Sequence, residues 1–71
     1  MKITIQQTEK LLKSGLSFSQ LGFSMMLTRL KTVYDKSPSQ ATLQSCMEEI
    51  NSFLVKFATI MGADYDKISK L

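Results

Sequence analysis

The sequence predicts an all-α fold, in which two long helices form an antiparallel hairpin and a short preceding helix completes a three-helix bundle. Helix-capping patterns of the type Ser/Thr-x-x-Gln recur along the chain, and apolar residues recur at helical spacing over its two longest segments. The only proline, Pro38, lies between those segments. Strand signals are weak, because residues 2–5 alternate but are too short to pair alone.

The first helix is predicted over about residues 5–14. Thr4 and Gln7 form a capping box just before and inside its first turn, and Gly15 falls where a helix ends in a left-handed residue. Its apolar residues are few: Ile5, Leu11, Leu12 and, at the corner, Leu16.

The second helix is predicted over about residues 18–36. Ser17 and Gln20 repeat the capping box, and Leu16 and Leu21 occupy the two positions of a hydrophobic staple. An apolar stripe follows at helical spacing: Phe23, Met26, Leu27, Leu30, Val33 and Tyr34.

The stretch YDKSPSQA, residues 34–41, is predicted to be the hinge of the hairpin. With Ser37 as N-cap, Pro38 falls at the first helical position and Gln40 completes a capping box. A hinge of three or four residues is too short for an interdomain linker, so the two long helices must lie antiparallel.

The third helix is predicted over about residues 38–61, ending at Gly62, and a last short turn, ADYDKISK, is expected to begin at Asp64. One side of this helix is apolar, with Val55 the lone exception on the polar side. The apolar side holds Leu43, Cys46, Met47, Ile50, Phe53, Leu54, Phe57, Ala58, Ile60 and Met61.

Three apolar residues, Phe18, Leu21 and Met25, are left over on the far side of the second helix, with Gly22 beside them. The start of this helix is therefore apolar nearly all round and needs cover on two sides. Either the first helix folds over this patch or a second chain covers it, and both can be partly true. The patch is the predicted partner-binding surface.

Length and composition predict a single small domain over residues 1–71. The chain is 44% hydrophobic and carries a net charge of +3, too apolar for a disordered polypeptide. No apolar run approaches the roughly 18 residues of a membrane span. The start, MKITIQQTEK, turns polar too soon for a secretory signal. We therefore expect a soluble, cytoplasmic protein.

The residue inventory argues against an enzyme. Histidine is absent and Cys46 is the only cysteine, which excludes zinc sites and histidine-assisted nucleophiles. Cys46 lies on the apolar side of the third helix, where a buried thiol is expected. Glu48 and Glu49 are adjacent and diverge by about 100° on a helix, so they cannot share a substrate. We expect no catalytic residue, no metal, no cofactor and no small-molecule substrate.

Nucleic-acid binding is less favoured than protein binding. Arg29, Lys31 and Lys36 spread along the second helix without the clustering that tracks phosphates, and such a spread is more often a solvated face. The expected function is a non-enzymatic protein-binding module that packs helices with another chain, as a homo- or hetero-oligomer.

The segment LTRLKTVYDKSPSQATLQSCMEEINSFLVKFATIMGADYDKI resembles the small type III secretion co-chaperones of the needle subunit. The matching pieces are Leu27 to Lys31, before the polar hinge, and Phe57 to Asp64, the apolar run at the end of the second long helix. The resemblance implies a partner-bound cytoplasmic chaperone.

The secretion-needle subunits are similar in another way, since they too are short helical hairpins with a proline-containing turn. Leu43-Gln44 matches their Leu-Gln pair, but Tyr65-Asp66 replaces their Lys-Asp pair and Ile50 replaces an aromatic residue. A needle-type structural subunit is therefore the second choice. Phage-encoded inhibitors, immunity proteins and small regulatory subunits also remain open.

Overall fold

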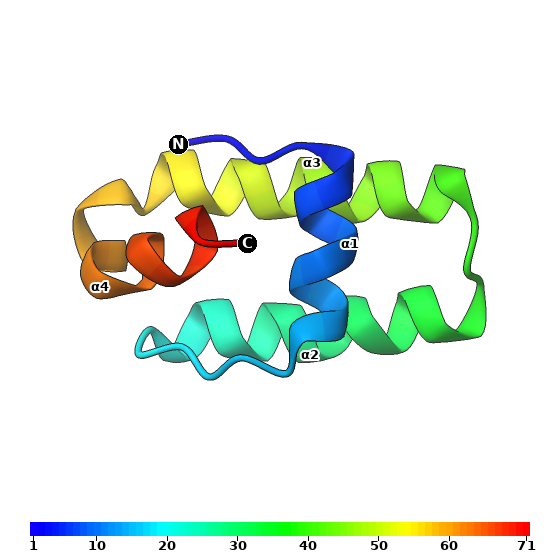
Figure 1. Ribbon diagram of the computed structural model, residues 1–71, viewed down its shortest axis with the longest axis horizontal. Coiled ribbons are helices and arrows are strands. Elements are labelled where there is room, and N and C mark those ends of the chain that lie inside the picture. Colours follow the sequence, from blue (N-terminus) through cyan, green and yellow to red (C-terminus); the bar gives the residue numbers. More distant parts are fainter.

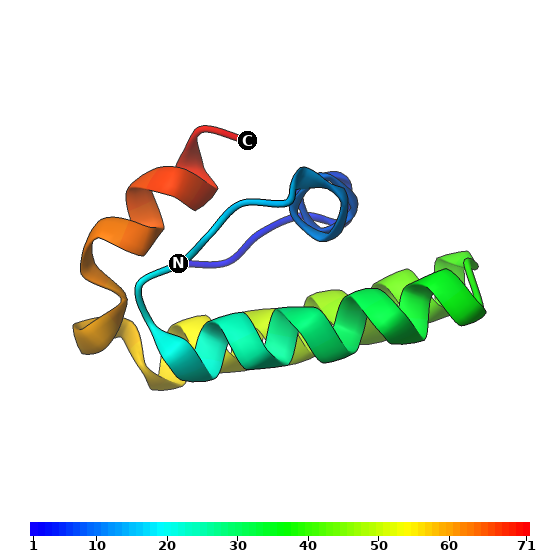
Figure 2. The same ribbon diagram turned by 90° about the horizontal axis from the view of Figure 1, so that it is seen from below.

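The computed structural model of the protein describes residues 1–71 and contains four helices and no strand, which confirms the all-α fold. The helices are α1 (Ile5–Ser14), α2 (Leu21–Lys36), α3 (Gln40–Lys56) and α4 (Ala58–Ser69). α2 and α3 form the antiparallel hairpin, and α1 crosses over one side of it (Figure 1). α4 lies at the open end of the hairpin, on the same side as α1 (Figure 2).

All four helices contribute to one hydrophobic core. Ile50, Phe23 and Leu54 are wholly buried where α2 and α3 face each other, as the two predicted stripes require. Val33 and Ile60 were expected on those stripes but are exposed. The core consists of Ile3, Leu11, Leu12, Phe23, Met26, Leu30, Leu43, Cys46, Ile50, Leu54, Met61 and Ile68.

α1 has the predicted bounds because its capping residues form the expected hydrogen bonds with their sequence neighbours. The Gln7 backbone N–H donates to Thr4 Oγ1 at 3.1 Å, and the Thr4 N–H donates to Gln7 Oε1 at 2.9 Å, which completes the capping box. At the other end Gly15 adopts φ +68°, the left-handed conformation that glycine allows.

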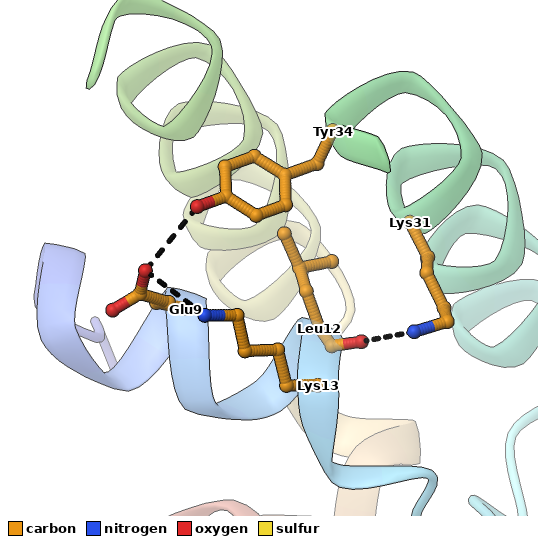
Figure 3. A network of polar contacts seen from close by, with 5 residues as sticks. All are labelled: Glu9, Leu12, Lys13, Lys31 and Tyr34. Atoms are coloured by element: carbon orange, nitrogen blue, oxygen red, sulfur yellow. Dashed lines mark hydrogen bonds and ion pairs between the residues drawn. The ribbon is translucent and has the colours of Figure 1, made fainter. Parts of the chain in front are cut away.

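Polar contacts from α1 also fix its position on α2 (Figure 3). The Tyr34 hydroxyl donates to Glu9 Oε2 at 3.2 Å, and Glu9 also pairs with Lys13 at 3.3 Å. Lys31 Nζ donates to the Leu12 carbonyl at 3.3 Å. This position near the C-terminal end of α1 is also favourable for a cation, because that end carries the negative pole of the helix dipole. α1 is therefore bound to the side of α2 that carries Lys31 and Tyr34.

α2 begins at Leu21, so the prediction of a helix from about residue 18 with a cap at Ser17 was wrong. The N-cap is Gln20, whose Oε1 accepts the Phe23 N–H at 2.7 Å. The preceding backbone is non-helical, and there the N–H groups of Ser19 and Gln20 donate to the carboxylate of Asp64 on α4, at 2.8 and 2.9 Å. A contact that is distant in sequence thus overrides the local capping box.

The hinge is a capped turn, but the cap of α3 is Ser39 and not Ser37. The Ser37 N–H closes α2 by donating to the carbonyls of Val33 and Tyr34. Ser39 Oγ then accepts the Thr42 N–H at 3.2 Å. Because Ser37 is occupied as the end of α2, the next serine starts α3.

Replacing Ser39 with alanine is expected to reduce the free energy of unfolding by about 1 kcal/mol, the typical value of an N-cap side chain. Ser37→Ala serves as the control and should cost less, because no hydrogen bond of the Ser37 side chain is present. Urea denaturation of both variants measures the difference. Equal losses would contradict the assignment of the cap to Ser39.

The predicted continuous helix over residues 38–61 is also wrong, since the chain bends at Phe57. Phe57 leaves the helical conformation (φ −115°, ψ 32°), and α4 starts at Ala58. Gly62 (φ +36°, ψ −117°) forms a kink inside α4 and does not cap α3. The bend turns α4 back so that Met61 and Ile68 are buried in the core, which a straight helix would leave in solvent.

Candidate protein-binding surface

Leu21 and Met25 lie one helical turn apart on the outer side of α2 and are 70% and 64% exposed. Of the two alternatives left open by the sequence, cover by the first helix does not hold for these two residues. α1 packs on the side of Tyr34, which lies nine residues from Met25 and hence on the opposite side of the helix. No other element covers the outer side of the hairpin (Figure 2). Both side chains are therefore available to another molecule.

Phe18 lies apart from these two residues. It belongs to the non-helical segment before α2, is half-buried, and packs edge-on against Phe23 with ring centroids 5.1 Å apart. Lys67 Nζ lies 5.8 Å from its ring centroid. Phe18 also lines a hollow of about 320 Å³ between the end of α1 and α2, together with Leu16 and Leu27. The predicted trio thus divides into a packed residue, Phe18, and an exposed pair.

Phe53 of α3 and Phe57, the residue that directly follows α3, extend the exposed pair across the hairpin. Gly22 of α2 faces Phe53, because a Cβ atom at Gly22 would lie in ordinary contact with that ring, at 3.6 Å. Met25 follows Gly22 by three residues and lies about 60° from it around α2. The rings of Phe53 and Phe57 are 4.6 Å apart, and both are only partly buried. We call Leu21, Met25, Phe53 and Phe57 the hairpin face.

The hairpin face borders a small hollow of about 190 Å³, whose apolar lining includes Met26 beside the two phenylalanines. Glu49 lines the same hollow and forms an ion pair with Arg29 of α2. Lys56 also lines it, with Nζ 5.6 Å from the Phe57 ring centroid, and has no carboxylate partner. The rim of this hollow therefore carries one unpaired positive charge, that of Lys56.

Asp64 holds the backbone that leads into the hairpin face. Its side chain is 1% exposed, and its two oxygens accept the N–H groups of Ser19 and Gln20, directly before Leu21. Burial alone would raise the pKa of Asp64. The two N–H donors, the Ser19 side chain and the charge of Lys67 outweigh burial and lower the pKa below its ordinary value. Asp64 is thus a buried carboxylate kept charged at the N-terminal end of α2.

The surroundings of Cys46 fit its predicted role as a small buried hydrophobe. The thiol is buried, and its pKa is raised by burial and by the nearby Glu49 carboxylate, with Arg29 acting in the opposite direction. A protonated, inaccessible thiol is a poor nucleophile. The structure contains no cluster of three or more metal-ligating side chains.

Comparison with protein-family models, curated proteins and solved structures found no match for this chain. Within the structure itself, every helix is too short or too polar to cross a membrane.

Proposed function

We propose that this protein is a non-enzymatic protein-binding module that packs a helix of another chain against the hairpin face. The observation that carries the proposal is the exposure of Leu21 and Met25 beside the partly buried rings of Phe53 and Phe57. Contiguous exposed apolar side chains commonly mark protein–protein contacts, and a helix laid across two helices buries them efficiently.

Within this class, we infer a chaperone-type partner protein that works in the cytoplasm, in the manner of the type III secretion co-chaperones. The inference rests on the resemblance of Leu27 to Lys31 and of Phe57 to Asp64. The first piece lies in α2, and the second spans the bend between α3 and α4. The second piece begins at Phe57 of the hairpin face, whereas Leu27 and Lys31 of the first piece line the hollow against α1.

The environment of the basic residues on α2 favours a protein partner over nucleic acid. Arg29 is engaged by Glu49, and Lys31 donates to the end of α1. Of the three cations on this helix, Lys36 alone makes no such contact, and a single free cation gives little of the multiple phosphate contact that nucleic-acid binding needs.

Leu21→Ser is expected to abolish partner binding while the melting temperature stays close to that of the wild type, because the side chain is already in solvent. Val55→Ser is the matched control, since Val55 is 56% exposed on α3 but lies outside the hairpin face. Tagged wild-type and variant chains are used to capture partners from the native cell, and size-exclusion chromatography over a concentration series tests for self-association.

Loss of one captured protein with Leu21→Ser and its retention with Val55→Ser would support the proposal. Self-association that Leu21→Ser removes would identify a second copy as the occupant, as in a needle-type subunit. A Leu21→Ser chain that melts far below the wild type with unchanged association would contradict the proposal and assign Leu21 to the core.

A further inference from the structure

We propose, on the basis of the proposed function, that the partner segment is an amphipathic helix whose apolar stripe is flanked by acidic residues, one of which pairs with Lys56. The hairpin face thus has a preferred partner chemistry. The apolar part and the charged part of this proposal rest on separate observations.

The apolar part follows from the spacing of the exposed side chains. Leu21 and Met25 are four residues apart on α2, and Phe53 and Phe57 are four residues apart at the end of α3. Leu21 and Met25 form a short ridge on α2. The adjacent rings of Phe53 and Phe57 lie at the end of α3, with Phe53 directly against Gly22 of α2. A helix with apolar residues at i, i+3, i+4 and i+7 presents a matching row.

The charged part follows from how the charged side chains around the small hollow are paired. Glu49 is paired with Arg29, whereas Lys56 lies over the Phe57 ring and has no carboxylate partner. An incoming helix that covers Phe57 brings its flank close to Lys56 Nζ. A carboxylate at that position gains an ion pair, and a lysine there meets a like charge.

The same charges argue against a second copy as the occupant. A two-fold dimer through the hairpin face places the Lys56 side chains of both subunits in one interface, which offers them no free carboxylate because Arg29 already engages Glu49. Each chain also carries a net charge of +3. A partner with acidic flanks has neither disadvantage.

The test uses two synthetic peptides of about 18 residues, long enough to form a helix on binding, with the same leucine stripe and blocked ends. One carries glutamate on both flanks of the stripe and the other carries lysine. Binding to the full chain is measured by fluorescence anisotropy at low and high salt. The variants are Lys56→Glu, Lys56→Gln and, as a control with the same charge change on an exposed residue of the C-terminal end, Lys70→Glu.

Wild type is expected to bind the acidic peptide about two- to fivefold more tightly than the basic one, the range of an exposed ion pair, and less so at high salt. Lys56→Gln should remove the preference and Lys56→Glu should reverse it, whereas Lys70→Glu should keep it. Because Lys56→Gln adds no acidic residue to the last turn of α3, it tests the ion pair even if Lys56→Glu is poorly folded.

Equal binding of both peptides, with Leu21→Ser abolishing both, would overturn the charge preference and leave the protein-binding function intact. If Lys56→Gln still binds the acidic peptide more tightly, another cation is responsible for the preference, and the inference is overturned as well. If neither peptide binds, both the inference and the use of the hairpin face for helices fall.

Discussion

Ile50→Asp is expected to remove a large part or all of the free energy of unfolding at 25 °C and neutral pH. Ile50 is wholly buried in the middle of α3, in the core where the hairpin helices meet. An aspartate there would be an unpaired buried charge, at a cost of about 4 kcal/mol or more. A chain of this length has a total stability of about 4–10 kcal/mol, so one such substitution removes a large part or all of it.

Circular dichroism during thermal and urea denaturation measures this effect. Val55→Asp is the matched control, because the same new charge on the same helix falls on a residue that is 56% exposed and should cost little. Ile50→Val, which only removes a methylene group, should cost about 0.5–1.5 kcal/mol. An Ile50→Asp variant that melts at the wild-type temperature would refute the position of the core.

Elements fixed by neighbouring residues could be predicted from the sequence. The capping box of Thr4 and Gln7 and the left-handed Gly15 define α1 almost completely, because all their partners lie within a few residues. The hairpin was predictable for a related reason: two apolar stripes joined by a three-residue turn have only one way to bury each other.

Elements fixed by distant residues could not be predicted in this way. Ser17 and Gln20 have the spacing of a capping box, but Asp64 holds the intervening backbone from 44 residues away. The bend at Phe57 has no local signal either, since the helical spacing of apolar residues continues through it. Only the need to bury Met61 and Ile68 against the rest of the core selects the bend.

The candidate site shows the same division. Leu21 and Met25 could be found from the sequence because they lie outside the apolar stripe of their own helix. Phe53 and Phe57 were missed as surface residues because they continue the stripe of α3. That stripe is broader than one neighbouring helix can cover. Its width was the one sign in the sequence that an edge of the stripe would stay partly exposed.

Asp64→Asn is expected to lower the free energy of unfolding by about 2–4 kcal/mol at neutral pH. The carboxylate accepts two backbone N–H groups in a site that is closed to water. An amide has one oxygen and one NH₂ group, so one of the two N–H donors would face another donor and lose its partner. Hydrogen bonds to a charged group contribute about 1.5–3 kcal/mol, and an unpaired buried donor adds a further cost.

Asp66→Asn is the control two residues away. Its side chain is exposed and makes no hydrogen bond or ion pair, so the same loss of charge should change stability by less than about 0.5 kcal/mol. Comparable losses in both variants would mean that net charge, and not the contacts of Asp64, is responsible.

The pH dependence of this difference tests the charge of Asp64 directly. Its pKa in the folded protein lies below the ordinary 3.8, so the unfolded chain takes up the proton first as the pH falls. The contribution of Asp64 is complete above the unfolded pKa, decreases as the pH falls below about 4, and is lost once the pH passes the folded pKa. Urea denaturation curves of wild type and Asp64→Asn should therefore differ most at pH 6–7 and converge towards pH 2. A constant difference over that range would show that the shape of the side chain, rather than its charge, holds α4 to the start of α2.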